Sequence, residues 1–307
     1  MRRAFVTKLT ELATNDDRIM LLTGDLGFMA LEPFANEHPN RFLNMGVAEQ
    51  NMIGVAAGLA EAGYIPFCYS ISTFASMRGY EFFRNDAIAQ RLQVRVVGVG
   101  TGFEYGHNGI SHYALEDLAL MRTQPGLTLI APADAEQART ALTKSWDLDG
   151  PVYYRLGKDD RLRVPGLDGR FDLGRTQALR DGKDLAIVTT GPIAVEASAA
   201  VELLAGHGVS ASLTVVASLN PAPLNDLESA LSKTPLVMSV EAHYLNGGLG
   251  SLLAELIAER KLPVRLVRCG VAATPDGHSG DEQHLLHFSG LTAQQLVDRC
   301  LSELRSG

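Results

Sequence analysis

The sequence has few cysteines and no excess of positive charge. Its 307 residues include three cysteines, Cys68, Cys269 and Cys300, which are widely spaced and form no CxxC pair. This pattern predicts reduced intracellular thiols and excludes a disulfide framework or a cysteine-based zinc site. A formal net charge of -8, with no stripe of Lys and Arg, excludes broad binding to nucleic-acid phosphates.

Long hydrophobic runs are missing as well. No stretch of about 18 apolar residues is present, so the sequence predicts no membrane-spanning helix. The first five residues lack the apolar segment of a secretory signal. We therefore expect a cytoplasmic protein with neither a membrane nor a nucleic acid as its partner.

The first half of the chain alternates between helical and strand patterns. Helices are predicted at residues 2–14, 47–62, 73–90 and 134–146, and strands at 19–23, 64–69, 94–99, 127–131 and 152–154. The valine-rich run at 94–99 is typical of a strand that is buried on both faces. Strands alternating with helices indicate a parallel sheet that helices cover on both sides.

A polar, glycine-rich segment follows, and a second unit begins after it. The segment at 157–184 predicts a linker with one edge strand near 176–179. Beyond it, strands are predicted at 185–190, 210–216, 236–240 and 264–269, and helices at 194–206, 224–232, 248–261 and 293–304. The expected fold class is α/β, with two domains at residues 1–160 and 185–307 joined by a linker at 161–184. Each domain should hold a mainly parallel sheet flanked by helices.

One carboxyl group, that of Glu49, lies within a run of apolar and small residues at 44–54. Burying a lone acid is unfavourable unless it has a partner or a chemical task. Its position favours a group that exchanges a proton, for example with a basic ring nitrogen of a cofactor. The alternative is that Glu49 only begins a helix, where an acid complements the helix dipole.

A glycine-rich loop at residues 98–112 follows the buried strand. It has neither the GxGxxG pattern that opens a helix nor the end of a P-loop, so it gives little support to nucleotide binding. His107 and His112 could share a metal ion, but two histidines alone form a poor site. We favour a substrate-facing acid/base or hydrogen-bonding role for His112, and we assign no metal ligand to this chain.

Four motifs together point to one family. They are residues 46–52 (GVAEQNM), 109–117 (GISHYALED), 131–134 (APAD) and 241–250 (EAHYLNGGLG). The first resembles the segment around the cofactor-activating glutamate of transketolases, and the second and third resemble further motifs of that family. The fourth is similar to a motif that transketolases share with 1-deoxyxylulose-5-phosphate synthase and the β subunits of 2-oxo acid dehydrogenases. The resemblance covers nearly the whole chain, in order.

The resemblance implies a shared cofactor. Transketolases hold thiamine diphosphate between a pyrophosphate domain and a pyrimidine domain, and this chain resembles only the pyrimidine-binding and C-terminal domains. Residues 24–27 (GDLG) do not match the Gly-Asp-Gly metal signature of the pyrophosphate domain. The chain therefore resembles the C-terminal subunit of a split transketolase. A separate N-terminal subunit should carry the pyrophosphate domain and ligate Mg²⁺. The expected assembly is a heterotetramer of two copies of each chain, with a homodimer core.

The resemblance also implies roles for single residues. Glu49 would activate the cofactor. Phe74, Met77 and Tyr80, three residues apart on a predicted helix, would surround its pyrimidine ring; ordinary core packing is the alternative. Asp25 would lie near the thiazolium ring, or else cap a helix or turn. On the substrate side the expected residues are His107, His112 and Arg155, of which Arg155 would bind a sugar phosphate or form a surface ion pair instead.

Two departures from the family pattern point to an altered substrate pocket. Gly100 stands where many transketolases have a substrate-contacting histidine, and Met29 lies near the position of a phosphate-binding serine. Glu104 and His107 are candidates for replacement contacts.

The expected reaction transfers a two-carbon ketol unit from a ketose, most simply a phosphorylated one, to an aldehyde. Two alternatives remain open. One is the β subunit of a 2-oxo acid dehydrogenase or a 1-deoxyxylulose-5-phosphate synthase-like enzyme. The other is a regulatory or scaffolding protein without activity.

Overall fold

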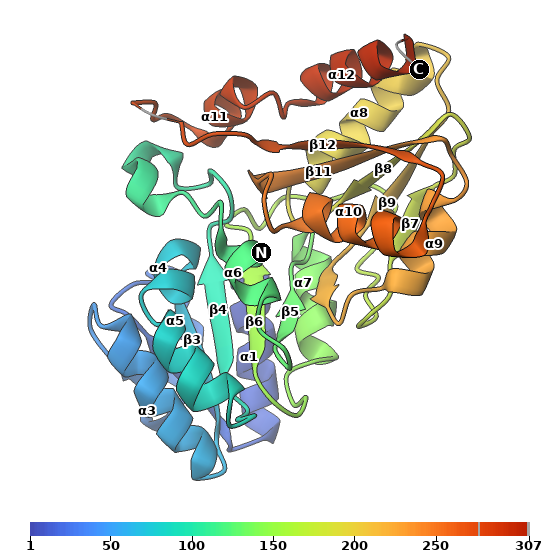
Figure 1. Cartoon of the computed structure of the whole chain (residues 1–307). Coiled ribbons are helices and arrows are strands. Elements are labelled where there is room, and N and C mark those ends of the chain that lie inside the picture. The colour runs from blue at the N-terminus through green and yellow to red at the C-terminus, as the bar shows by residue number, and fades with distance from the viewer. Residues whose placement is uncertain (276, 306–307) are drawn as a thin grey trace.

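The chain folds into two α/β units, each built on one sheet with helices on both faces (Figure 1). This computed structural model describes residues 1–275 and 277–305, so residues 306 and 307, the end of the predicted second domain, lie outside the described residues. The architecture confirms the predicted fold class. Within the described residues, no helix combines the length and apolar character needed to cross a membrane.

The first sheet has seven strands in the order β10-β5-β6-β4-β3-β1-β2. Its strands are β1 (Ile19–Thr23), β2 (Phe42–Asn44), β3 (Ile65–Ile71), β4 (Arg95–Val99), β5 (Thr128–Ile130), β6 (Val152–Leu156) and β10 (Ser218–Asn220). All pairings are parallel except that of β10 with β5. Strands β1, β4 and β6 are buried along their whole length, as their apolar sequences require.

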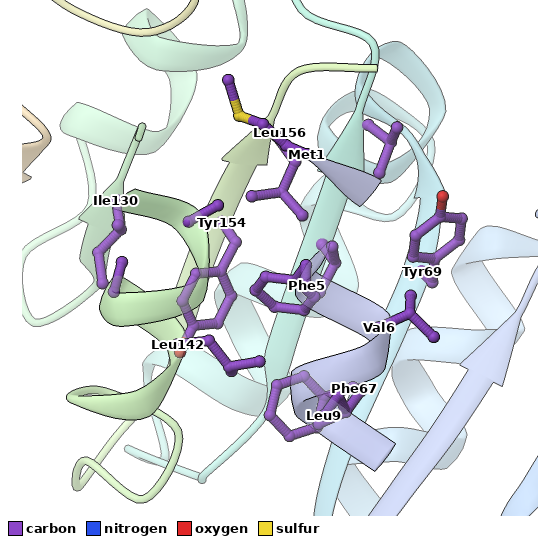
Figure 2. Packing of buried hydrophobic residues seen from close by; sticks show 14 of the residues in the cluster. Met1, Phe5, Val6, Leu9, Phe67, Tyr69, Ile130, Leu142, Tyr154 and Leu156 are labelled. Atoms are coloured by element: carbon purple, nitrogen blue, oxygen red, sulfur yellow. The ribbon is translucent and has the colours of Figure 1, made fainter. Parts of the chain in front are cut away.

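Helices cover both faces of this sheet. They are α1 (Arg2–Asn15), α2 (Glu32–Glu37), α3 (Glu49–Glu61), α4 (Ser72–Met77), α5 (Tyr80–Phe82), α6 (Asp117–Arg122) and α7 (Ala135–Thr143). Figure 2 shows how α1 lays Phe5 and Leu9 against the sheet. The ring of Phe5 lies 5.1 Å from that of Tyr154 and 6.4 Å from that of Phe67. Burial of a side chain of this size contributes about 1.5–3 kcal/mol, which anchors α1 to β3 and β6.

The second sheet has five strands in the order β12-β11-β8-β9-β7. They are β7 (Gln177–Arg180), β8 (Leu185–Thr189), β9 (Ala211–Val215), β11 (Leu236–Tyr244) and β12 (Arg265–Val271). Only the edge strand β7 runs antiparallel to its neighbour, β9. The helices of this unit are α8 (Ala194–Gly206), α9 (Leu224–Leu231), α10 (Leu249–Arg260), α11 (Glu282–Phe288) and α12 (Ala293–Arg305).

Several short elements, such as β2, α2, α6 and α11, were not predicted from the sequence, and two further differences affect the architecture. Strand β10, from the second half of the chain, joins the edge of the first sheet and ties the two units together. The helix predicted at 73–90 is three consecutive segments, α4, α5 and a π-helical turn η2 (Phe83–Ile88). The interruption falls at Gly79, where α3 passes so closely that a Cβ atom would overlap Cδ1 of Ile53. Only glycine allows this approach.

Candidate active site at the carboxyl ends of the first sheet

The candidate site lies where parallel strands of the first sheet end. Strand β1 ends at Thr23, β3 at Ile71 and β4 at Val99, and the loops and helices that follow them carry most of the predicted site residues. Glu49 is not on one of these loops; it is the first residue of α3. The carboxyl ends of parallel strands are the usual place for a ligand site in open α/β sheets.

Glu49 is buried, with 2% of its surface exposed. The hydroxyl of Ser70, on β3, donates a hydrogen bond of 2.9 Å to its Oε1, and Nη1 of Arg78 lies 3.1 Å from its Oε2. Gly24 lets β1 approach from a third side, because a Cβ atom there would lie 3.2 Å from Oε1. The side chain of Glu49 thus points into the site, and the view that it only begins α3 does not account for its contacts.

A cation lies directly beside this carboxyl group, and an aromatic ring packs against that cation. The guanidinium carbon of Arg78 lies 3.9 Å from the ring centre of Phe74, in a cation–π contact. The ring of His112 meets that of Phe74 edge to face, with 5.0 Å between their centres. Glu49, Phe74 and His112, which the sequence placed in one site, therefore lie around the Arg78 guanidinium.

The surroundings of His112 favour its neutral imidazole form. Its Nδ1 lies 2.9 Å from the hydroxyl of Ser111, and its side chain is partly buried. Burial lowers the pKa of His112 below its usual value, and the nearby charge of Arg78 lowers it further. A neutral histidine can accept a proton or a hydrogen bond from a substrate hydroxyl, so the geometry is compatible with the predicted substrate-facing role.

The three residues predicted to surround a pyrimidine ring lie on two consecutive helical segments. Phe74 contacts the guanidinium of Arg78, the partner of Glu49, whereas Met77 is 39% exposed at the end of α4. Tyr80 follows the interruption at Gly79. Its hydroxyl lies 3.2 Å from the carbonyl of Leu120, on α6. Because α4 ends before Tyr80, these residues do not lie on one uninterrupted helix as the sequence predicted.

Asp25 and His107 are exposed at the rim of the site. Asp25 adopts a left-handed backbone with φ of 59°, and its Oδ1 accepts a hydrogen bond of 2.9 Å from the side-chain amide of Asn44. His107 lies on the short turn Gly106–Asn108, which precedes the turn of His112. Their roles toward cofactor and substrate remain predictions.

Arg155 lies in a different environment from the one expected of a phosphate ligand. Its side chain is 1% exposed, and its Nε lies 2.8 Å from Oδ2 of Asp117. Nη2 donates to the carbonyl oxygens of Ala114 and Ala242, at 2.9 and 3.1 Å. Arg155 therefore forms a buried ion pair with Asp117 inside the first unit, and it reaches the second unit through the carbonyl of Ala242. Neither the sugar-phosphate contact nor the surface ion pair weighed from the sequence describes this position.

At position 100, where the sequence departs from the family pattern, a neighbouring aromatic ring occupies the space of the missing side chain. Gly100 adopts φ of 83°, and a Cβ atom there would overlap the ring of Tyr105. The ring of Tyr105 thus fills the space that a larger side chain at residue 100 would need. It lies 6.3 Å from the ring of His112, and Nζ of Lys158 is 4.4 Å from its centre. Tyr105 and Lys158 are therefore further candidates for contact with a substrate.

The surroundings of the site are apolar and open. Large exposed hydrophobic side chains occur on the loop after β1, before α3 and on the turn before His112: Phe28, Met29, Val47 and Ile110. A cavity of about 200 Å³ lies between Asp25, Phe28 and Phe42. Exposed apolar surface of this kind is typical of a face that another protein covers.

Sequence reasoning missed two residues that contact Glu49. Ser70 lies on a buried strand and is fully buried itself, so nothing in its sequence context marks it. Arg78 could have been found, because it follows Phe74 by four positions. Side chains at this spacing meet on one face of a helix.

Comparisons with known proteins agree with this architecture. The family model "Transketolase, pyrimidine binding domain" matches residues 1–161, and "Transketolase, C-terminal domain" matches residues 174–296. A subunit of the 6-deoxy-6-sulfo-D-fructose transketolase of Clostridium sp. strain MSTE9 is 38% identical, and the match covers 97% of this chain and 92% of that protein. One of the subunits of the apulose-4-phosphate transketolase of Phocaeicola vulgatus is 33% identical over 94% of this chain and 92% of its own length.

A solved structure has the same fold over almost its whole length. It is a split-gene transketolase in the form of an inactive β4 tetramer, and it superposes with a TM-score of 0.87 at 37% sequence identity. The match covers 99% of this chain and 97% of that one. At these coverages the similarity extends across both units.

Proposed function

This chain belongs to the transketolase family, and on that premise we propose that it is the C-terminal subunit of a thiamine-diphosphate-dependent transketolase built from two different chains. The buried carboxyl group of Glu49, which Arg78 links to the ring of Phe74, is the observation that carries the proposal. A buried acid with one oxygen fixed by Ser70 and the other facing an exchangeable partner can serve a basic ring nitrogen.

The residues around Glu49 fit a flat, basic heterocycle. Phe74 offers an aromatic face, and Oε2 of Glu49 already receives a planar N–H donor, the guanidinium of Arg78. When bound, thiamine diphosphate supplies a nucleophilic carbon that carries a two-carbon unit. Glu49 would hold a proton at the pyrimidine ring nitrogen through a short hydrogen bond, while Phe74 stacks on the ring.

We assign the substrate side to the loop that holds His112. A neutral imidazole at this position can accept the proton of a sugar hydroxyl, and Tyr105 and Lys158 line the same side. The proposed reaction transfers a ketol unit from a phosphorylated ketose to an aldehyde. The proposal names a class of sugar because two relatives of similar identity are named for different sugars.

The proposal includes a partner. We assign the pyrophosphate domain and the Mg²⁺ ligands to an N-terminal subunit, and we expect a cytoplasmic α2β2 assembly with two copies of this chain at its core. Phe28, Met29, Val47 and Ile110 support a protein cover over the site, because they leave apolar surface exposed around it. The inactivity of the related β4 tetramer is in line with a site that needs a second kind of chain.

Reconstitution with the N-terminal subunit tests the proposal. The complex should convert a ketose plus an aldehyde, and this chain alone should not. Glu49→Ala should lower the rate of the complex about 100-fold or more, the usual contribution of a proton-transferring group. Turnover by this chain alone, or an unchanged rate in the Glu49→Ala complex, would contradict it.

The same complex distinguishes the alternatives. Activity with pyruvate and an artificial electron acceptor would indicate a 2-oxo acid dehydrogenase subunit. Condensation of pyruvate with an aldehyde would indicate a 1-deoxyxylulose-5-phosphate synthase-like enzyme. Binding of the partner without any turnover would indicate a scaffolding protein.

A further inference from the structure

Arg78 makes at once the two contacts that a bound pyrimidine would need. Its guanidinium lies 3.9 Å from the ring centre of Phe74, and its Nη1 lies 3.1 Å from Oε2 of Glu49. Stacking on Phe74 and bonding to Glu49 are the two interactions that the proposed function assigns to the cofactor. A pyrimidine ring and the Arg78 guanidinium therefore cannot both occupy this place.

The two groups are chemically alike. A guanidinium is a flat, delocalised cation whose N–H groups lie in its plane. A 4-aminopyrimidine that is protonated at the ring nitrogen is also flat and cationic, and it presents an N–H group at its edge. Both can stack on an aromatic ring and donate to a carboxylate. Arg78 thus offers Glu49 and Phe74 the same interactions as the ring.

We propose that Arg78 is an internal placeholder for the aminopyrimidine of the cofactor. This inference rests on the proposed function. In the chain without cofactor, Arg78 pairs with the buried carboxylate of Glu49, whose charge would otherwise be left alone at 2% exposure. The cofactor then exchanges with a cation that is already there, instead of entering an empty pocket.

The surroundings of Arg78 allow this exchange. Its side chain is 45% exposed, so the guanidinium can swing into water without losing its hydration. Ser70 holds the other oxygen of Glu49 and does not depend on Arg78. Displacement therefore changes the donor at Oε2 and leaves the carboxyl group in position.

The exchange with Arg78 also restricts which ring systems can bind at Glu49. A neutral ring that lacks an N–H donor would leave a buried carboxylate without a partner, which is strongly unfavourable. A ring that can carry a proton replaces the lost charge. Arg78 would therefore act as a specificity-determining residue, although it is absent from the final contact with Glu49.

Equilibrium binding of thiamine diphosphate with Mg²⁺ to the reconstituted complex tests the inference. Arg78→Gln removes the competing cation, so the dissociation constant should fall about tenfold, the combined effect expected of a half-exposed ion pair and a cation–π contact. Arg78→Lys keeps the charge but loses the flat fork, and should give a smaller decrease. Arg84→Gln, at an exposed arginine on η2, is the matched control and should bind as the wild type does.

The outcomes separate this inference from the proposed function. If the wild-type complex binds the cofactor and Arg78→Gln binds it equally or more weakly, Arg78 is not a placeholder, and weaker binding would make it a ligand. If the wild-type complex does not bind thiamine diphosphate, the proposed function fails and the placeholder fails with it. Should Arg78→Gln not fold, Arg78→Lys decides, because binding that is equal or weaker in this variant also contradicts the proposal.

Discussion

Among the residues that the structure describes, the carboxylates of Glu49 and Asp117 are each buried and paired with an arginine, and the two pairs are built differently. In the pair inside the first domain, Asp117 and Arg155 are both 1% exposed, and Tyr153 donates a further hydrogen bond of 3.0 Å to Asp117. In the candidate site, Glu49 is equally buried, but its partner Arg78 is half-exposed and is stacked on one aromatic ring. One arginine has its charge enclosed by protein, and the other reaches in from solvent.

The difference separates a structural ion pair from an exchangeable one. Arg155 bonds to Asp117 and to carbonyl groups of both domains, so removing its partner strands a charge that cannot reach water. Arg78 can turn outward into water, so its own charge is not stranded when the pair with Glu49 opens, provided that another donor takes its place at Glu49. Both acids are buried, so the exposure of the arginine distinguishes the pairs: the pair with the half-exposed arginine is the one that a ligand can enter.

Matched alanine substitutions at the two acids should show the largest contrast. Asp117→Ala should lower the free energy of unfolding by about 3–5 kcal/mol, because it leaves the buried Arg155 without its counter-charge. Glu49→Ala should lower it by about 1 kcal/mol or less, because Arg78 regains water. Urea unfolding of the chain without cofactor measures both values. Equal losses would remove the distinction between the two pairs.

A second contrast lies within the buried region itself. Glu241 accepts hydrogen bonds from the backbone of Leu249 and Gly250, at 2.7 and 2.8 Å, at the start of α10. His243 lies 2.7 Å from the carbonyl of Tyr244 through Nδ1, and its Nε2 accepts from the backbone of Ala119 in the other domain. The glycine turn at 247–250 is thus held by the glutamate, and the histidine joins the domains.

Burial shifts these two groups in opposite directions. It raises the pKa of Glu241 to about 7 and lowers the pKa of His243 to about 4. As the pH falls from 7 to 4.5, the native state takes up a proton at Glu241 before the unfolded state does, which stabilises the fold. As the pH falls from 6.5 to 4, the unfolded state takes up a proton at His243 before the native state does, and this destabilises the fold. The two effects oppose each other.

Glu241→Gln should make visible the loss of stability that protonation of His243 causes at low pH. The variant keeps an acceptor for the start of α10 but loses the proton uptake at residue 241. Between pH 6.5 and 4.5, its free energy of unfolding should therefore fall more than that of the wild type, by on the order of 1–2 kcal/mol. Urea unfolding at a series of pH values measures the slope. Parallel slopes for variant and wild type would show that Glu241 does not titrate in this range.

Local pattern was enough to predict most of the fold. The apolar runs at 94–99 and 185–190 became β4 and β8, since strands buried on both faces need continuous apolar sequence. β2 and β10 were missed because three residues carry no measurable period. The position of β10 depends on its pairing with β5, which no local pattern contains.

The site was predictable only where chemistry marks a residue. Glu49 is conspicuous as an acid in an apolar run, and in the structure it contacts Arg78, whose guanidinium stacks on Phe74; its role remains a prediction. Arg155 shows the limit of this reasoning, because an arginine at the end of a strand looks the same whether it meets a phosphate or a buried aspartate. Tertiary packing against Asp117 decides, and sequence spacing alone does not reveal it.

The smallest expected effect concerns His112, which reports on Arg78 without any cofactor. The positive charge of Arg78 is the second cause, after burial, of the lowered pKa of His112. Arg78→Gln removes that charge and leaves the burial, so the pKa of His112 should rise toward its ordinary value without reaching it. NMR titration of the His112 ring in the isolated chain measures the change, and Arg84→Gln should leave the titration where it is in the wild type. A pKa that stays in place in Arg78→Gln would mean that the guanidinium does not lie over Phe74 in solution, and Glu49 would then have no exchangeable partner.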